Sequence, residues 1–369
     1  MSATQQTINF TRGVPADESY PLEQVAECAA AVIAGPHGTQ VMQYGGSRGF
    51  PPLREWLAAR YSVPAEQVML ANGSLQFIDL VGLALLEPGD TVFVESPTYD
   101  RTLTLLRRHH ASVVGVAMEP DGPSMEAFEA LLQRHQPRLF YTIPDFQNPS
   151  GATASLEKRR RLAELAEQYG FWLLEDAPYR PLRYRGEQLP SLFDFASGRT
   201  LHMSSFTKQI APGVRVGYMV GDAGILSQLA KAAEDTYISP NLLGEGTVYE
   251  FCRRGWLEPQ LERLRELYLP RLEAICEAIR ENLPGAEWIE PDGGFFLSVT
   301  LGAGITNEIL REHAAALKLN LSRGEGFFPN PADGTRFLRL PFCALSPAEI
   351  GEGLRRLASA VATATQEAQ

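Results

Sequence analysis

The feature that most constrains the fold is a regular alternation of helix-period and short β-branched stretches in the middle of the chain. Apolar residues recur at helical spacing over 74–86, and the run Thr91–Glu95 after the turn at 87–90 is typical of a buried strand. The alternation continues to residue 176 and predicts right-handed crossovers and a mostly parallel sheet. The further predicted helices span 99–110, 124–135 and 155–169, and the further predicted strands span 112–118, 138–144 and 171–176.

Three more strands complete this predicted sheet. One spans 68–71, ahead of the alternation, and two span 200–205 and 214–220 with only a loop between them. That short connection predicts an antiparallel pair that closes the sheet. The expected fold class is therefore α/β, with a large domain built on a mostly parallel, seven-stranded sheet flanked by helices.

The pattern changes after about residue 255 and predicts a smaller α+β domain. The first residues, with an extended segment over 7–10 and a helix from Leu22, lack a core of their own. We therefore expect an arm over 1–37 that docks on the small domain, a large domain over 38–256 and a small domain over 257–369. The small domain is predicted to contain a long linking helix over 257–283, strands over 294–299 and 336–340, a helix over 306–317 and a last helix from Ser346.

Charge argues against nucleic acid as a partner. The 33 basic and 44 acidic residues give a formal net charge of −11, and no basic block is large enough to cover a face. The densest basic run, 158–161, is predicted to be a solvated helix face.

The cysteines and the apolar runs indicate the cellular location expected for the protein. Four cysteines lie far apart without a C-x-x-C pair, so we expect neither a metal site nor disulfides. The N-terminus has no signal-peptide pattern, and the longest apolar runs are far short of the ~20 residues of a membrane span. A cytoplasmic protein without a membrane partner is expected.

Polar residues follow the ends of the predicted strands, where open parallel sheets bind ligands. Gly73-Ser74 opens a helix, and such a helix N-terminus binds anions. Asp176 and Lys208 each follow another strand, and Arg215 lies just beyond. Each residue alone is ordinary, but jointly they predict a site for an anion, a carbonyl electrophile and a basic ring nitrogen.

Five motifs resemble the fold-type I pyridoxal phosphate enzymes, specifically the class I and II aminotransferases near the 2-aminoadipate and kynurenine branch. The resemblance covers nearly the whole chain and implies pyridoxal 5′-phosphate as cofactor, a homodimer, and an amino acid and a 2-oxo acid as small-molecule partners. The motifs are QNPSG at 147–151, EDAPY at 175–179, SSFTK at 204–208, APGVRVGY at 211–218 and RFLRL at 336–340.

The resemblance implies a role for each residue at the cofactor. Lys208 would hold it as a Schiff base and shuttle a proton, and Asp176 would pair with the pyridine nitrogen. Asn148 and Tyr179 would hydrogen-bond the ring's phenolate oxygen, and Tyr99 would stack on the ring. The phosphate would bind the backbone of Gly73, Ser74 and Leu75, the hydroxyl of Ser205, the guanidinium of Arg215, and Tyr44 from the partner subunit.

The resemblance also implies the substrate site. Arg339 would hold the α-carboxylate through two hydrogen bonds, beside Asn148 and Gly13. Arg12 stands in a loop where the family has small residues, and as a second anion-binding residue it would favour dicarboxylic or otherwise acidic substrates. A solvent-exposed loop arginine is the other interpretation.

Departures from the family pattern leave the reaction open. The chain begins near residues 8–10, so we expect it to lack the extra N-terminal helix that reads the substrate in that branch. Gln209, Ser298 and Arg323 replace a common Thr, Trp and Pro, which remodels the pocket. The leading hypothesis is transfer of the amino group of a free L-α-amino acid to a 2-oxo acid. The alternative is a cyclase or a β/γ-eliminating or replacing enzyme of a specialised biosynthetic pathway.

Two other classes fit less well. The run Gly45–Gly49 matches the G-x-S-x-G elbow of α/β-hydrolases, but Phe50-Pro51-Pro52 separates the serine from the helix that should follow it directly. An amino-acid sensor on this fold would carry a basic DNA-binding segment before Ile8, which is not expected here.

Overall fold

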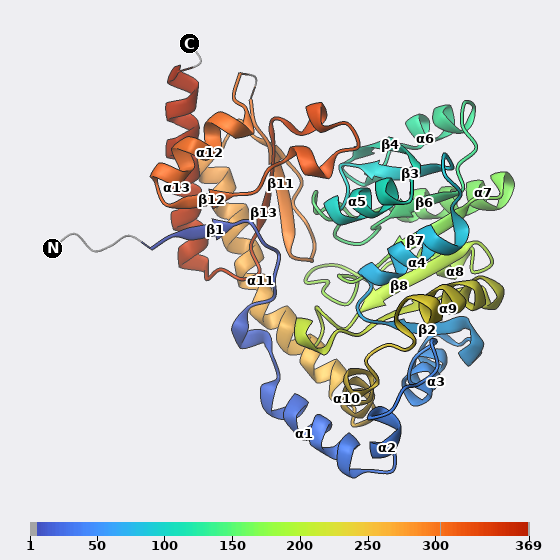
Figure 1. The fold of residues 1–369 in the computed structure, drawn as a ribbon. Coiled ribbons are helices and arrows are strands. Elements are labelled where there is room, and N and C mark those ends of the chain that lie inside the picture. The colour runs from blue at the N-terminus through green and yellow to red at the C-terminus, as the bar shows by residue number, and fades with distance from the viewer. Residues whose placement is uncertain (1–5, 303, 368–369) are drawn as a thin grey trace.

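The centre of the molecule is an eight-stranded sheet, as seen in a computed structural model that describes residues 6–302 and 304–367 (Figure 1). The strand order is β2-β9-β8-β7-β6-β3-β4-β5. The strands are β2 (Val68–Ala71), β3 (Thr91–Ser96), β4 (Ser112–Glu119), β5 (Gly122–Pro123), β6 (Leu139–Thr142), β7 (Trp172–Asp176), β8 (Thr200–Ser205) and β9 (Gly217–Val220).

The sheet differs from the prediction in two places. The predicted seven strands are joined by β5, which is antiparallel to β4 and has two residues, too few to leave a pattern in the sequence. Strand β9 is antiparallel to β8, as predicted, but it does not close the sheet. It lies between β8 and β2, because β2 pairs with its outer side and forms the edge.

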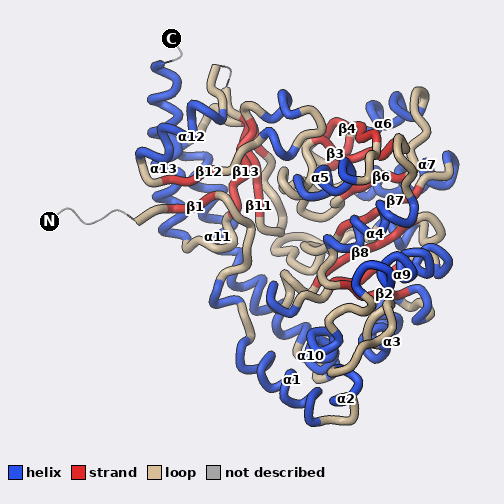
Figure 2. The backbone as a smooth tube through the Cα atoms, in the orientation of Figure 1, coloured by secondary structure: helices blue, strands red, loops and turns tan. Residues whose placement is uncertain are grey.

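Helices cover both faces of this sheet (Figure 2). Consecutive side chains of a strand point to opposite faces, and both faces are apolar here. Val92 and Val94 belong to one buried cluster and Phe93 to another. The helices up to residue 253 are α1 (Leu22–Ala34), α2 (Gly38–Val41), α3 (Pro51–Tyr61), α4 (Leu75–Leu85), α5 (Asp100–Arg108), α6 (Met125–Leu132), α7 (Leu156–Tyr169), α8 (Leu192–Phe195), α9 (Ala223–Tyr237) and α10 (Leu242–Arg253).

The C-terminal part forms a second lobe with its own apolar core. Its three-stranded antiparallel sheet has the order β10-β11-β13, and helices α11, α12 and α13 pack beside it (Figure 1). The elements are α11 (Leu257–Asn282), β10 (Glu287–Trp288), β11 (Phe296–Thr300), α12 (Asn307–Ala316), β12 (Leu319–Leu321), β13 (Phe337–Pro341) and α13 (Pro347–Glu367).

The N-terminal arm contacts both lobes. Strand β1 (Ile8–Phe10) pairs in parallel with β12, and Phe10 is buried in the core of the small lobe. Helix α1 instead packs on α10: Cys28 and Val32 belong to the apolar cluster of the large lobe. The arm therefore docks on the small lobe through β1 and the residues next to it, since Arg339 donates to the carbonyl of Thr11 and Cys343 to that of Val14. The division of the chain into three parts stays a prediction.

Helix α11 runs through the cores of both lobes. Its buried apolar residues from Leu257 to Tyr268 belong to the cluster of the large lobe, and those from Leu272 to Ile279 belong to that of the small lobe. Pro270 lies inside the helix, between the two sets.

The basic run at 158–161 is not a uniformly solvated face, contrary to the prediction. Arg159 is fully buried and pairs with Asp145, with Nη2 2.8 Å from Oδ1. The helical period explains this, because Arg159 is three residues from the buried Leu162 and shares its inward face. Lys158 bonds to Glu119 and Asp121, while Arg160 is exposed.

The remaining sequence expectations concern cysteines and membranes. All four cysteines are free and buried. Within residues 6–302 and 304–367, the structure contains no helix with the length and apolar character needed to cross a membrane.

Candidate active site

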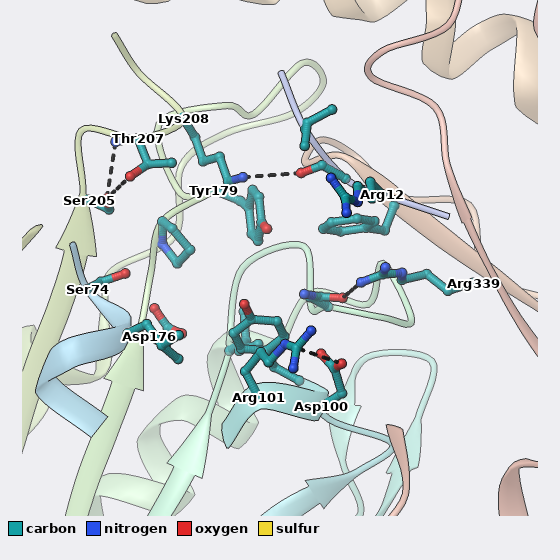
Figure 3. A pocket seen from close by; sticks show the side chains of 18 of the residues that line it. Arg12, Ser74, Asp100, Arg101, Asp176, Tyr179, Ser205, Thr207, Lys208 and Arg339 are labelled. Atoms are coloured by element: carbon teal, nitrogen blue, oxygen red, sulfur yellow. Dashed lines mark hydrogen bonds and ion pairs between the residues drawn. The ribbon is translucent and has the colours of Figure 1, made fainter. Parts of the chain in front are cut away.

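A cavity of about 650 Å³ opens at the carboxyl ends of β7 and β8, between the two lobes. It receives residues from the N-terminal arm, from the large sheet and from the small lobe (Figure 3). Every predicted site residue except Tyr44 lines it: Arg12, Gly13, Gly73, Ser74, Leu75, Tyr99, Asn148, Asp176, Tyr179, Ser205, Lys208, Arg215 and Arg339.

The start of α4 forms one end of the cavity. Ser74 is the N-cap of α4, and its side chain makes no capping hydrogen bond. Gly73 has φ +92°, and a Cβ there would lie 2.5 Å from Nη2 of Arg215. Gly217 of β9 also has to be glycine, because a Cβ would collide with the backbone at Gly73 and Ser74. Backbone N–H groups at a helix start favour an anion.

Hydroxyl groups and a guanidinium border the same end. The Ser205 hydroxyl donates to Oγ1 of Thr207 at 2.7 Å, and the backbone N–H of Thr207 donates to Ser205 Oγ at 3.1 Å. Arg215 donates from Nη2 to the carbonyl of Asn72 at 2.9 Å, which holds the guanidinium beside the start of α4. These groups extend the anion site.

Lys208 follows β8 and extends its amine into the cavity. The amine donates to the carbonyl oxygen of Gly13 at 3.2 Å (Figure 3). Burial lowers the pKa of the Lys208 amine below its ordinary value, and the nearby Arg339 and Arg215 lower it further. A lowered pKa favours the neutral amine, which is the nucleophilic form of lysine.

Asp176 ends β7 and lies opposite the amine. Its Oδ2 accepts a hydrogen bond from the hydroxyl of Tyr141 at 2.7 Å, while its Oδ1 is buried and has no partner among the described residues. Burial raises the pKa of Asp176 to about 7, although the hydrogen bond from Tyr141 lowers it. Because Asp176 lines the cavity, Oδ1 is an acceptor that a bound ligand can use.

Two tyrosines form walls of the cavity. Burial raises the pKa of Tyr99 to about 12 and that of Tyr179 well above its ordinary value, so both phenols are neutral donors. The ring of Tyr179 packs edge-on against Phe296, with 5.6 Å between centroids.

Arg339 reaches the cavity from β13 of the small lobe. Its guanidinium carbon lies 4.8 Å from the ring centre of Phe296 and 4.7 Å from that of Phe327, so two aromatic rings flank it. Nη1 donates to Oδ1 of Asn148 at 3.1 Å, and Nη2 donates to the carbonyl of Thr11 at 3.0 Å. Its Nε is buried without a partner among the described residues, so a donor remains for a ligand.

Three further arginines line the cavity. Arg101 lies 3.8 Å from the carboxylate of its neighbour Asp100. Within the part of the chain that the structure describes, neither Arg12 nor Arg323 has a hydrogen-bond or ion-pair partner, and both are exposed. The cavity therefore has more cationic than anionic groups, although the whole chain is acidic.

One predicted residue lies elsewhere. Tyr44 does not line the cavity, and 74% of its surface is exposed. The resemblance placed its contact in a partner subunit, so its exposure in a single chain does not contradict that role.

Sequence reasoning missed several residues of the site. Thr207 directly precedes Lys208, a position that could have been foreseen. Tyr141 stands in a buried strand run and gave no signal, and the lobe-crossing contacts of Phe296 and Phe327 depend on how the lobes pack. Asp145 also follows a strand end, but its side chain points away from the cavity to Arg159.

Comparison with known proteins agrees with this site. The family model for aminotransferase class I and II matches residues 5–357. The chain is 33% identical to aromatic-amino-acid aminotransferase 1 of Thermococcus litoralis, over 97% of this chain and 88% of that protein.

Solved structures give the same result. The multiple substrate aminotransferase of Thermococcus profundus has a TM-score of 0.94 and 33% identity, covering 99% of this chain and 93% of that one. The α-aminoadipate aminotransferase LysN of Thermus thermophilus, solved with N-(5′-phosphopyridoxyl)-L-leucine, has a TM-score of 0.92 and 32% identity, covering 98% and 93%. The chain belongs to the class I and II aminotransferases, enzymes that use pyridoxal phosphate.

Proposed function

We propose that this chain transfers the amino group of a free L-α-amino acid to a 2-oxo acid, with pyridoxal 5′-phosphate bound in the cavity and attached to Lys208. The observation that carries the proposal is that Asp176, whose buried Oδ1 has no partner among the described residues, lines the same cavity as Lys208. When bound, pyridoxal phosphate supplies an aldehyde that bonds amines and a ring that withdraws electrons from the substrate's Cα.

The residues present fit both ends of this cofactor. The start of α4, with Gly73, Ser74 and Leu75, offers backbone donors for the phosphate, and Ser205 and Arg215 add a hydroxyl and a guanidinium. At the other end, Asp176 has one oxygen free to accept a hydrogen bond from a protonated ring nitrogen. The space beside Gly73 would be lost with any larger residue.

Lys208 is proposed as the catalytic base. Its buried position favours the neutral amine, which takes the proton from the substrate's Cα once the substrate has displaced it from the cofactor. The neighbouring cations Arg339 and Arg215 favour the same neutral form.

Tyr99, Tyr179 and Asn148 are proposed to orient the cofactor. Tyr179 and Asn148 offer a phenol and an amide for the ring's oxygen, and Tyr99 offers an aromatic face. All three line the cavity from different loops, after β3, β6 and β7, so they restrict the ring from several sides.

Arg339 is proposed to hold the substrate's α-carboxylate, next to Asn148 and Gly13. Its fixed position between two rings supports this role, because a guanidinium already held in place loses little freedom on binding. Gly13 leaves room there, since a Cβ would run into the ring of Phe296.

Arg12 is proposed to read a second anionic group on the substrate. It has no partner among the described residues and lines the cavity, as does Arg323, a departure already noted in the sequence. Two guanidiniums that have no partner in the described part of the chain support a preference for acidic over neutral amino acids.

A homodimer is also proposed. Tyr44 is exposed, as is Met42 two residues before it, and the family places the corresponding tyrosine of the partner subunit on the phosphate. We propose the cytoplasm as its location, supported by four cysteines that are all free and buried.

A single-turnover experiment without an acceptor tests the proposed reaction. Transfer predicts one equivalent of 2-oxo acid per site and loss of the cofactor's aldehyde absorbance, which 2-oxoglutarate restores. Elimination or cyclisation would regenerate the aldehyde form without an acceptor, and this result would replace the proposal by the alternative reaction.

A further inference from the structure

Tyr141 and Asp176 lie on neighbouring strands of the large sheet and point to the same face. The register pairs Tyr141 of β6 with Leu174 of β7, and Asp176 is two residues beyond Leu174, so its side chain emerges on the same side. The Tyr141 hydroxyl donates to Oδ2 of Asp176 at 2.7 Å. The side chain of Tyr141 is fully buried and that of Asp176 nearly so.

The two oxygens of Asp176 have different surroundings. Oδ2 is bonded to Tyr141, whereas Oδ1 is buried without a partner among the described residues. Asp176 lines the cavity, and Tyr141 does not. The phenol therefore bonds the carboxylate from outside the cavity and leaves Oδ1 without a competing donor among the described residues.

Several titratable groups act on this carboxyl. His202 of β8 favours its charged form, and Glu95 of β3 disfavours it. Tyr99 and Tyr179 face it from the cavity, and their phenols are neutral because burial raises their pKa values. Burial has the largest effect on the pKa of Asp176 and raises it, while the hydrogen bond from Tyr141 is the largest effect in the other direction.

We propose that Tyr141 is a positioning residue that keeps the proton shared by Asp176 and the cofactor's ring nitrogen on the nitrogen. The inference rests on the proposed function, because it requires the ring beside Oδ1. A carboxylate that accepts a phenol hydrogen on one oxygen is a weaker base at the other. It therefore competes less for the shared proton, and the ring keeps the positive charge with which it withdraws electrons.

Removing the phenol oxygen reverses this effect. In Tyr141→Phe, Asp176 keeps its place in the cavity but loses its only donor among the described side chains. The buried carboxyl then favours its neutral form and takes a larger share of the proton. A purely structural role for Tyr141 predicts a loss of stability without any movement of the proton.

The test compares the holoenzymes of wild type, Tyr141→Phe and a protein with 3,5-difluorotyrosine at position 141, with Tyr184→Phe as the matched control. The Tyr184 hydroxyl donates at 2.7 Å to the carbonyl of Gly294, and Tyr184 does not line the cavity. The measurements are the ¹⁵N NMR signal of a ring-labelled cofactor, the pH midpoint of the visible absorption band and the dissociation constant of the cofactor. None of them depends on turnover.

In Tyr141→Phe we expect the ¹⁵N signal to move toward that of neutral pyridine and cofactor binding to weaken about tenfold. The pH midpoint should rise, because a less positive ring favours retention of the proton on the nitrogen that joins it to Lys208. Tyr184→Phe should leave all three unchanged. Site-specific 3,5-difluorotyrosine at position 141, a stronger donor, should lower the midpoint, and it decides the matter alone if Tyr141→Phe does not fold.

Equal ¹⁵N signals and equal midpoints in wild type and Tyr141→Phe would overturn the inference and leave the proposed function intact. A wild-type protein that takes up no cofactor, or whose visible band survives Lys208→Ala, would overturn the proposed function itself.

Discussion

The amine of Lys208 and the carbonyl oxygen of Gly13 are 3.2 Å apart, although 195 positions separate the two residues in the chain. Gly13 follows β1, which pairs with β12 of the small lobe, whereas Lys208 follows β8 of the large sheet. The arm therefore reaches the amine on which the proposed chemistry depends.

Lys208→Ala should abolish transfer and the visible band of the bound cofactor while the fold persists. Alanine has no amine to attach the cofactor or to take the Cα proton. Absorption spectra, circular dichroism and single-turnover assays check this. A variant that retains more than a trace of single-turnover product would contradict the proposed role.

Arg339→Lys should lower kcat/KM for every amino acid by about 10- to 100-fold, because lysine cannot donate two parallel hydrogen bonds to the α-carboxylate. Steady-state kinetics measure this. Arg336→Lys is the matched control, since Arg336 is on the same stretch and donates to the carbonyl of Leu301 away from the cavity. If kcat/KM falls equally in both variants, Arg339 does not bind the substrate's α-carboxylate.

Arg12→Ala and Arg323→Ala should each lower kcat/KM for glutamate by about tenfold and change that for glutamine little. The two substrates have the same shape and differ in charge, so the ratio isolates recognition of the anion. Arg108→Ala, an exposed arginine outside the cavity, should leave the ratio unchanged. An unaltered ratio in both cavity variants would mean that neither arginine reads the substrate.

A heterodimer of two variants, Tyr44→Phe and Lys208→Ala, tests whether Tyr44 acts across a dimer. Tyr44→Phe should weaken cofactor binding about tenfold. In a heterodimer with Lys208→Ala, action across the interface gives one site with both defects and one intact site. Cofactor titration of the purified heterodimer should then show wild-type affinity at half of the sites. If Tyr44 acts within its own subunit, no site regains that affinity.

Glu245 should make stability fall as the pH rises. Burial raises its pKa to about 8, and its Oε1 has no partner among the described residues. Below pH 4.5 the carboxyl is protonated in both states; between about 4.5 and 8 the unfolded chain ionises first, so the free energy of unfolding decreases. Glu245→Gln removes this penalty and should be more stable than wild type by about 1–4 kcal/mol at about pH 8.5.

Urea unfolding at about pH 5 and about pH 8.5 measures the difference. Glu250→Gln is the control on the same helix, because Arg253 and Arg254 hold the pKa of Glu250 below its ordinary value. Glu250→Gln should therefore destabilise the protein at about pH 8.5. If the free energy of unfolding changes equally with pH in wild type and Glu245→Gln, Glu245 is not the source of the pH dependence.

The large sheet could be predicted because central strands such as β3, β6 and β7 contain apolar runs that are buried on both faces. Phe93 and Val94 illustrate this, since they lie in different clusters on opposite faces. The two-residue β5 and the pairing of β1 with β12 could not be predicted, because short strands leave no period and the paired residues are about three hundred positions apart.

The cavity was predicted through side chains at strand ends, where topology alone brings them together. Tyr141 was missed because its role depends on register between two strands and on one hydroxyl. Arg159 was predicted to be solvated because it is charged and belongs to a basic run. Its position on the inward face of α7 was not considered.

Pro270 makes helix α11 easier to bend at one turn. A proline inside a helix removes one backbone hydrogen bond and makes bending at that turn less costly than elsewhere. In α11 this turn falls between the residues packed in the large lobe and those packed in the small lobe. A rotation of the small lobe that carries Arg339 toward or away from bound substrate would thus pivot at residue 270, with both apolar cores moving as intact bodies.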